Sequence, residues 1–458
     1  MPWYFDDVLP PEVAISSLDP NVGWDPVDPA WVNITTPGRQ KILIPWAEDD
    51  PGLAGPELWV ERVLHHAKTG STYGCNGLLA VHWRTSEVVP EFAALYAAAW
   101  DDAASVESVY TDWATANFGP EVAAQIAHLF VSLDSFSTGD IPPHRTGVFP
   151  GTATNLPRVT QSCCGKFGPC FDMKQGASRG KCKADSCNGF APNSTCAPVH
   201  FGFVNTFREL APRVRGAANR ARFSIWHNSF EYFGQLVEVE LAATKLIESM
   251  TNLSNRNSTI SQKRAIGLTA LQKLRQLSRA WENMTSSLQQ TVMSSGTLGT
   301  LATNDANMYI RNFPFNSTKT TLEALGIKVS KDALPRAEYS GPDRLFVRTV
   351  RTTILLSEGT LNIQATLLTK QATYSDDTWE VVLHHRMLAQ NPQPWTTMLL
   401  SRVPGRGVFN AQISIGNSDF EWWISAKDAK SGSKLVFPAG YIDAHETVTV
   451  IVVDDSVR

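Results

Sequence analysis

Two short clusters of polar and aromatic residues hold the side chains best suited to chemistry. Each follows an apolar run, the first ending at position 45 and the second at position 81; the clusters are Trp46, Glu48 and Asp49, then His82, Trp83 and Arg84. Carboxyl and imidazole groups can transfer protons, a guanidinium can bind a carboxylate through two parallel hydrogen bonds, and an indole can stack on a ligand. We therefore predict Glu48, Asp49 and His82 as catalytic residues, and Trp46, Trp83 and Arg84 as substrate-binding residues.

Three short strands and one helix are the elements that would position these clusters. Apolar runs over residues 13–18, 41–46 and 77–83 predict parallel strands. An apolar stripe over residues 58–67 predicts a helix between the second and third strands, with Asp50 and Pro51 at its start and Gly70 at its end. Parallel α/β proteins bind ligands where their strands reach the carboxyl ends. We therefore expect both clusters on one edge of the sheet.

The small number of strands limits the fold of this part. Three strands cannot close an eight-stranded barrel. Residues 1–102 are interpreted as the C-terminal part of a (β/α)8-type catalytic barrel whose earlier strands are missing from the sequence. The alternative is a small open α/β layer that is complete in itself. Residues 90–136 carry apolar side chains at helical spacing and predict a run of helices.

The rest of the chain predicts two further regions, so the fold class is multidomain: an α/β partial barrel, then an α-helical domain, then an all-β domain. Residues 103–340 form the helical domain, with two long amphipathic helices within 203–293 and a cysteine-rich insertion at about 150–200. Residues 341–458 change to a period of two, which predicts seven or eight strands of an immunoglobulin-like β-sandwich accessory domain.

Composition and modification motifs favour an extracellular protein. The net charge of −4 offers no basic surface for nucleic acid, and no run reaches the roughly 20 apolar residues of a membrane span. Six Asn-x-Ser/Thr motifs predict glycosylation, and six clustered cysteines predict three disulfides; they are Asn33, Asn193, Asn252, Asn257, Asn283 and Asn316, and Cys163, Cys164, Cys170, Cys182, Cys187 and Cys196. The first residues lack a signal peptide. Either it has been removed or Met1 is not the true start, and we expect the second.

The residues of the two clusters also have structural explanations. Residues 48–50 could be only a charged loop, in which Asp50 caps the following helix. His82 and Arg84 could form a structural pair with that acidic loop. Both explanations stay open beside the functional ones.

Other candidate residues carry less weight. Asp19 and Asp25 each precede a proline, which is typical of turns. Cys75 is predicted as a buried thiol, because no other feature pairs it with a base. Adjacent histidines at 65–66 and 384–385 are poor chelates, since neighbouring side chains diverge on helices and strands alike. No metal site and no cofactor are predicted.

Residues 79–119, LAVHWRTSEVVPEFAALYAAAWDDAASVESVYTDWATANFG, resemble the end of the catalytic barrel and the following helical domain of glycoside hydrolases of the α-glucuronidase and N-acetylglucosaminidase type. The resemblance covers about residues 13–140 and, more loosely, the long helices to about residue 300. It implies a secreted polysaccharide-degrading enzyme with an appended immunoglobulin-like or fibronectin-like sandwich. In those families the catalytic acids lie on middle strands of the barrel, which have no counterpart here. The resemblance therefore implies binding roles for the two clusters, without a complete catalytic pair.

Two functional hypotheses follow from these patterns. The first is a glycoside hydrolase, or a C-terminal fragment of one, that cleaves an extracellular polysaccharide containing uronate or amino sugars through its carboxyl groups. The alternative is a non-catalytic extracellular module that binds glycans or proteins through the cysteine-rich insertion and a sandwich face with Trp379, Trp422 and Trp423. The first hypothesis requires Glu48 and Arg84 to open into one cleft.

Overall fold

The computed structural model describes residues 2–19, 26–47, 56, 58–82, 88–134, 201–253, 258–303, 314–336, 339–370, 378–391 and 393–454. The chain combines helices with several sheets and divides into two compact units. The first unit comprises Met1–Arg213, Ser229–Met284 and Thr303–Pro335, and the second comprises Val214–Asn228, Thr285–Ala302 and Arg336–Arg458. The six clustered cysteines lie outside the described residues, so their predicted disulfides stay a prediction.

A parallel sheet opens the first unit, with its strands in the order β1–β2–β3 among the described residues. The strands are β1 (Ile15–Leu18), β2 (Lys41–Ile44) and β3 (Gly77–Leu78), and a parallel bridge between Trp46 and Val81 extends the last pair. The prediction of adjacent parallel strands is thereby confirmed. Apolar side chains from the strands and the loop between β1 and β2 form the core of this sheet; they are Ile15, Val27, Trp31, Ile34 and Leu43.

A single arginine ties the N-terminal segment to the sheet. The side chain of Arg39 is buried and makes five hydrogen bonds, as many as a guanidinium has N–H groups. Its acceptors are the carboxylate and carbonyl oxygens of Asp6 and the carbonyl oxygens of Leu9, Pro10 and Val13. A segment with little regular structure beyond one 3-10 turn, Pro2–Phe5, is thus held by this side chain together with the carboxylate of Asp6, which also accepts from the backbone N–H groups of Thr35 and Thr36.

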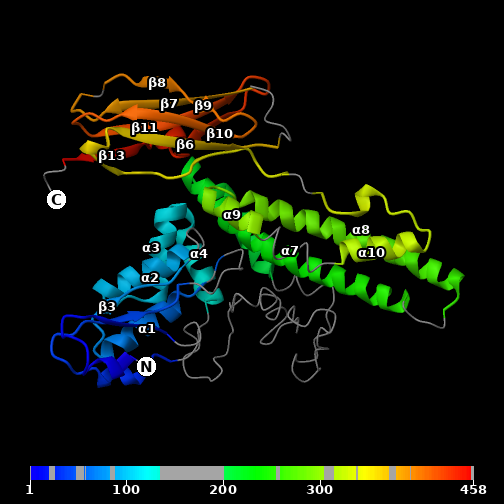
Figure 1. Cartoon of the computed structure of the whole chain (residues 1–458), viewed down its shortest axis with the longest axis horizontal. Coiled ribbons are helices and arrows are strands. Elements are labelled where there is room, and N and C mark those ends of the chain that lie inside the picture. Colours follow the sequence, from blue (N-terminus) through cyan, green and yellow to red (C-terminus); the bar gives the residue numbers. More distant parts are fainter. Residues whose placement is uncertain are drawn as a thin grey trace. The chain divides into compact units, whose positions relative to one another are not determined.

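Helices lie between β2 and β3 and after β3, where the sequence predicts them. They are α1 (Val60–Thr72), α2 (Val89–Trp100), α3 (Val106–Phe118) and α4 (Pro120–Leu133), coloured blue to cyan in Figure 1. Ser105 caps α3 by accepting a hydrogen bond from the backbone of Ser108, and Gly119 separates α3 from α4 with a φ of 92°. The predicted helix between the second and third strands is therefore confirmed, and so is the predicted run of helices from residue 90, as far as residue 134.

Both predicted ends of α1 are wrong. The N-cap of α1 is Trp59, nine residues after the predicted start at Asp50, which lies outside the described residues, and the helix runs past Gly70 to Thr72. Gly70 is required by packing instead, because a Cβ atom there would lie 2.6 Å from Cδ2 of the fully buried Leu43. The residue with positive φ after the helix is Gly74, at 79°.

The two long helices predicted within 203–293 are also present, with one break. They are α7 (Ala217–Leu253) and α8 (Ile260–Gln290), accompanied by α6 (Val204–Leu210), α9 (Ser295–Thr303) and α10 (Phe315–Ala324). Pro212 and Gly216, whose φ is 82°, separate α6 from α7, where the sequence predicts one continuous helix. In the first unit, the ring of Phe130 on α4 contacts those of Phe207 and Phe230, with centroids 6.2 and 5.9 Å away, and so joins α4 to α6 and α7.

The second unit contains two sheets whose inner faces share one hydrophobic core. In the described residues the strand orders are β4–β6–β10–β9 and β5–β13–β11–β7–β8, with β12 paired to β11 (Figure 1). Every pairing is antiparallel except β13 with β5. The strands are β4 (Arg344–Val347), β5 (Thr353–Leu355), β6 (Thr360–Leu368), β7 (Trp379–Met387), β8 (Thr396–Leu399), β9 (Ser401–Arg402), β10 (Val408–Ser414), β11 (Phe420–Asp428), β12 (Lys434–Phe437) and β13 (Val448–Val453).

Alternation along each strand builds this core. On β11, Phe420, Trp422, Ile424 and Ala426 are buried, while the residues between them face outward. The described residues from 344 to 453 contain ten strands, where the sequence predicts seven or eight. Residues 345–356 and 395–403 each contribute two, because the chain changes partners within them.

Candidate functional site at the edge of the parallel sheet

The carboxyl ends of the three parallel strands meet at one edge of the sheet, which is the candidate site. Asp19 follows β1, Trp46 follows β2, and His82 follows the last paired residue after β3. The indole N–H of Trp46 donates to the carbonyl oxygen of Asp19 over 2.9 Å, and the backbone N–H of Ala47 donates to the carbonyl oxygen of Val81 over 3.1 Å. Asp19, Trp46 and the backbone preceding His82 are therefore fixed to one another.

Two of the six predicted site residues belong to the described chain. Trp46 is half-buried, with its N–H engaged as above, and His82 is exposed with its ring edge-to-face against Phe92 of α2, the centroids 4.7 Å apart. The other four, Glu48, Asp49, Trp83 and Arg84, lie outside the described residues, and their roles stay predictions.

Helix α1 contacts this edge through two buried side chains one turn apart, Arg62 and His66. A carboxylate oxygen of Asp19 and Nδ1 of His66 are hydrogen-bonded, and Nη2 of Arg62 donates to the carbonyl oxygen of Trp46 over 3.0 Å. The guanidinium of Arg62 also lies over the indole of Trp59, 3.3 Å from the ring centroid. His66 and Arg62 are each 1% exposed and Asp19 is 4% exposed. Asp19 is thus one partner of a buried pair, where the sequence predicts a turn residue.

Buried carboxyl groups hold the first turn of the same helix. Oε1 of Glu91 accepts from the backbone N–H of Trp59, and Oδ2 of Asp134 accepts from the backbone N–H of Glu61, both over 3.0 Å. The hydroxyl of Tyr110 donates to the same oxygen of Asp134 over 2.7 Å. Burial raises the pKa of Asp134 from 3.8 to about 7, although these two hydrogen bonds favour its charged form. Backbone N–H groups at a helix start need such acceptors, so both residues keep α1 in place.

The supporting roles of Arg62, His66, Glu91 and Asp134 were not predicted from the sequence. A signal existed for two of them. Positions 59, 62, 66 and 70 share one face of α1 at spacings of three and four, and all four residues are buried. Charged residues on such a stripe indicate buried ion pairs. Their partners, however, are distant in sequence, with Asp19 47 residues from His66 and Asp134 73 residues from Glu61.

The remaining nucleophile and metal candidates are accounted for by packing. Burial raises the pKa of the half-buried Cys75 thiol to about 11, so it is protonated at neutral pH and a poor nucleophile. The rings of His65 and His66 lie edge-to-face, 5.9 Å apart, and His66 is engaged by Asp19. Among the described residues, no group of three or more His, Cys, Asp or Glu side chains is arranged as a metal site.

The tryptophans predicted on a binding face of the second unit do not form one. Trp422 is 1% exposed and belongs to the core, so its assignment to a surface is wrong. His384 and Tyr441 stack on the ring of Trp423, with centroids 3.8 and 3.7 Å away and planes tilted by 5° and 15°. Two rings cannot share one side at these distances, so they cover both faces of Trp423. Trp379 packs against the same core as Trp422.

Comparison with known proteins adds no further constraint. No family model matches the chain, and no curated protein matches it significantly in sequence. Within the described residues, no helix combines the length and the apolar character needed to cross a membrane.

Proposed function

We propose that the protein is a glycoside hydrolase, or the C-terminal part of one, that acts on an extracellular polysaccharide containing uronate or amino sugars. The supporting observation is the pairing of Trp46 with Val81, together with the hydrogen bond from Ala47 to Val81. Glu48 follows Ala47 directly, and Trp83 and Arg84 follow His82, so the two predicted clusters begin at neighbouring points of one sheet edge. Glycoside hydrolysis needs this combination of carboxyl, polar and aromatic groups around one bond.

Each residue has a distinct role in this proposal. Glu48 transfers the proton and Asp49 supplies the second carboxyl group, while His82 bonds a hydroxyl group or moves a proton. Arg84 binds a uronate carboxylate through two parallel hydrogen bonds, and Trp46 and Trp83 pack on the sugar. Asp19, His66 and Arg62 are too buried to meet a substrate and keep the edge in shape.

We also propose a fold family for each of the two units. The parallel sheet with α1 and α2 is the end of a (β/α)8-type barrel, and the two-sheet unit is an immunoglobulin-like accessory domain. Secretion is supported by the glycosylation motifs, since the asparagine of every motif within the described residues is exposed; these are Asn33, Asn252, Asn283 and Asn316.

Sugar release from defined polysaccharides tests the proposal. The chain is incubated with uronate-containing and N-acetylhexosamine-containing polysaccharides, and products are measured by mass spectrometry. We expect Glu48→Gln to lower kcat/KM at least about 100-fold, because a general acid–base group contributes that much or more. Glu107→Gln, at an exposed position on α3, is the matched control and should leave the rate unchanged.

Two outcomes contradict the proposal. One is the absence of product from either polysaccharide class with the unaltered chain. The other is equal rates for the unaltered chain and Glu48→Gln. Arg84→Met adds a test of the substrate class: it should raise KM for the uronate-containing substrate and leave KM for the amino-sugar substrate unchanged.

A further inference from the structure

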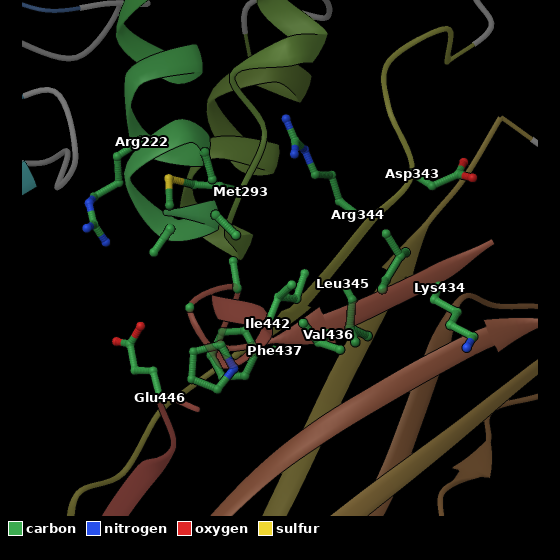
Figure 2. A pocket seen from close by; sticks show the side chains of 17 residues that line it. Arg222, Met293, Asp343, Arg344, Leu345, Lys434, Val436, Phe437, Ile442 and Glu446 are labelled. Atoms are coloured by element: carbon green, nitrogen blue, oxygen red, sulfur yellow. The ribbon is translucent and has the colours of Figure 1, made fainter. Parts of the chain in front are cut away.

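A cavity of about 390 Å³ lies within the second unit, separate from the sheet edge of the first unit. Its walls come from the first turns of α7, from β4, from β12 and from the loop leading into α11 (Tyr441–Ala444) (Figure 2). Volumes from about 300 to 1,000 Å³ are typical of sites for small organic molecules. The size of this cavity therefore suits a small molecule rather than a folded partner.

The walls of this cavity are largely apolar and partly open to water. Leu345, Val436, Phe437 and Ile442 lie close together on one side, and Met293 lies apart from them, by the helices (Figure 2). Met293 is 37% exposed and Ile442 61% exposed, although both adjoin a concave surface. Covering such side chains gains roughly 25 cal/mol per Å² of apolar surface. An apolar molecule in the cavity would be stabilised by this burial.

Arg344, a cation in the lining, has no carboxylate partner among the described residues. Nη2 of Arg344 donates to the carbonyl oxygen of Gln290 over 3.2 Å, while its Nε is buried without a hydrogen-bond partner in the described chain. No described carboxylate lies within ion-pair distance of it. Asp343 and Glu446 also line the cavity, on opposite sides of it in Figure 2. The charge of Arg344 is thus met by a carbonyl oxygen in the described residues, and a guanidinium gains more from an anionic acceptor than from a neutral one.

We propose that this cavity binds a small amphiphilic carboxylate, with its hydrocarbon part on Leu345, Val436 and Phe437 and its carboxylate on Arg344. The site is independent of the proposed glycan cleavage. An activity assay therefore neither supports nor weakens it.

Two probes of equal size and different charge test this site. Binding of 4-phenylbutyrate and of 4-phenylbutan-1-ol to the full chain is measured by isothermal titration calorimetry at pH 7. We expect saturable binding of the carboxylate with a Kd below about 1 mM, and at least about tenfold weaker binding of the alcohol. This comparison needs no variant, so it stands even where a substitution prevents folding.

Variants then locate the binding. Arg344→Met should weaken 4-phenylbutyrate at least about tenfold and make the two probes equal, because the charged contact is removed. Arg348→Met changes an exposed arginine just after β4 and should leave both affinities unchanged. Ala221→Phe fills the cavity and should abolish binding of both probes. Circular dichroism confirms that each variant is folded.

Any of four results overturns the proposal. These are no saturable binding of 4-phenylbutyrate, equal affinity of the two probes for the unaltered chain, equal effects of Arg344→Met and Arg348→Met, and unchanged binding by folded Ala221→Phe.

Discussion

The parallel sheet of the first unit and the two sheets of the second unit are held by different forces. The parallel sheet of the first unit is short, and helix α1 is fixed to it and to the following helices by buried polar contacts of Arg62, His66, Glu91 and Asp134. The sheets of the second unit are longer and share an almost entirely apolar core. Directional contacts fix the positions of atoms, whereas apolar packing mainly fixes the fold. The polar support therefore lies beneath the edge proposed to bind substrate.

Because the core of the second unit is apolar, we expect its stability to be most sensitive to the loss of buried side-chain volume. Trp422→Ala should destabilise this unit by about 3–5 kcal/mol, because the side chain is 1% exposed and its removal leaves a large cavity. Hydrogen exchange of the β7 and β11 amides measures this effect directly. Leu399→Ala, at a side chain that is 66% exposed, is the control and should change stability by less than about 0.5 kcal/mol. Similar effects of the two variants would contradict the apolar-core account.

The first unit should be most sensitive to loss of a polar partner. His66→Leu places an apolar side chain at this buried position of α1 and leaves the buried carboxylate of Asp19 without its imidazole partner. We expect this to lower the free energy of unfolding by about 3 kcal/mol. Hydrogen exchange of the α1 amides reports the loss. Adding Asp19→Asn should recover part of it, since no buried charge then remains. His128→Leu, at an exposed position on α4, is the matched control. No recovery in the double variant would count against the charge argument.

The last prediction concerns pH. The pKa of Asp134 is about 7 in the folded protein against an ordinary 3.8, so folding retains a proton that the unfolded chain has lost. The free energy of unfolding should therefore fall as pH rises from about 4 to about 7, with a contribution of about 1.4 kcal/mol per pH unit. Asp134→Asn keeps an oxygen acceptor for Tyr110 and Glu61 and cannot titrate.

Urea unfolding at pH 5, 6 and 7 should show a flatter pH dependence for Asp134→Asn than for the unaltered chain. Asp112→Asn, an exposed carboxyl group on α3, should leave the dependence as it is. Parallel profiles for Asp134→Asn and the unaltered chain would show that burial does not retain this proton.

The predictability of the fold from sequence follows the same division. Strands of the second unit are predictable because every second side chain is apolar, and the parallel strands because short apolar runs flank a helix. Alternation also indicates that Trp422 and Trp423 face opposite sides, but not which side is the core. In the sequence, Gly70 is typical of a residue that ends a helix. Its close packing against Leu43, which explains the glycine, is seen only in the structure.

The candidate site is predictable in its location and not in its support. The positions of Trp46 and His82 after β2 and β3 follow from strand pattern alone. The pair of Asp19 and His66 does not, because it joins residues far apart in the chain and neither residue type is commonly fully buried.

The five hydrogen bonds of Arg39 have a consequence for change in this region. Four of the five acceptors in residues 6–13 are carbonyl oxygens, which every amino acid possesses, so single side-chain replacements at residues 7–13 leave these bonds intact. Asp6 is the exception, because its carboxylate accepts from Arg39 and from the backbone N–H groups of Thr35 and Thr36. An inserted residue would instead shift the acceptors out of reach of the guanidinium. Arg39→Lys offers a compact ammonium with three donors in place of a planar group with five. This corner of the molecule is therefore tolerant of altered composition and intolerant of altered length.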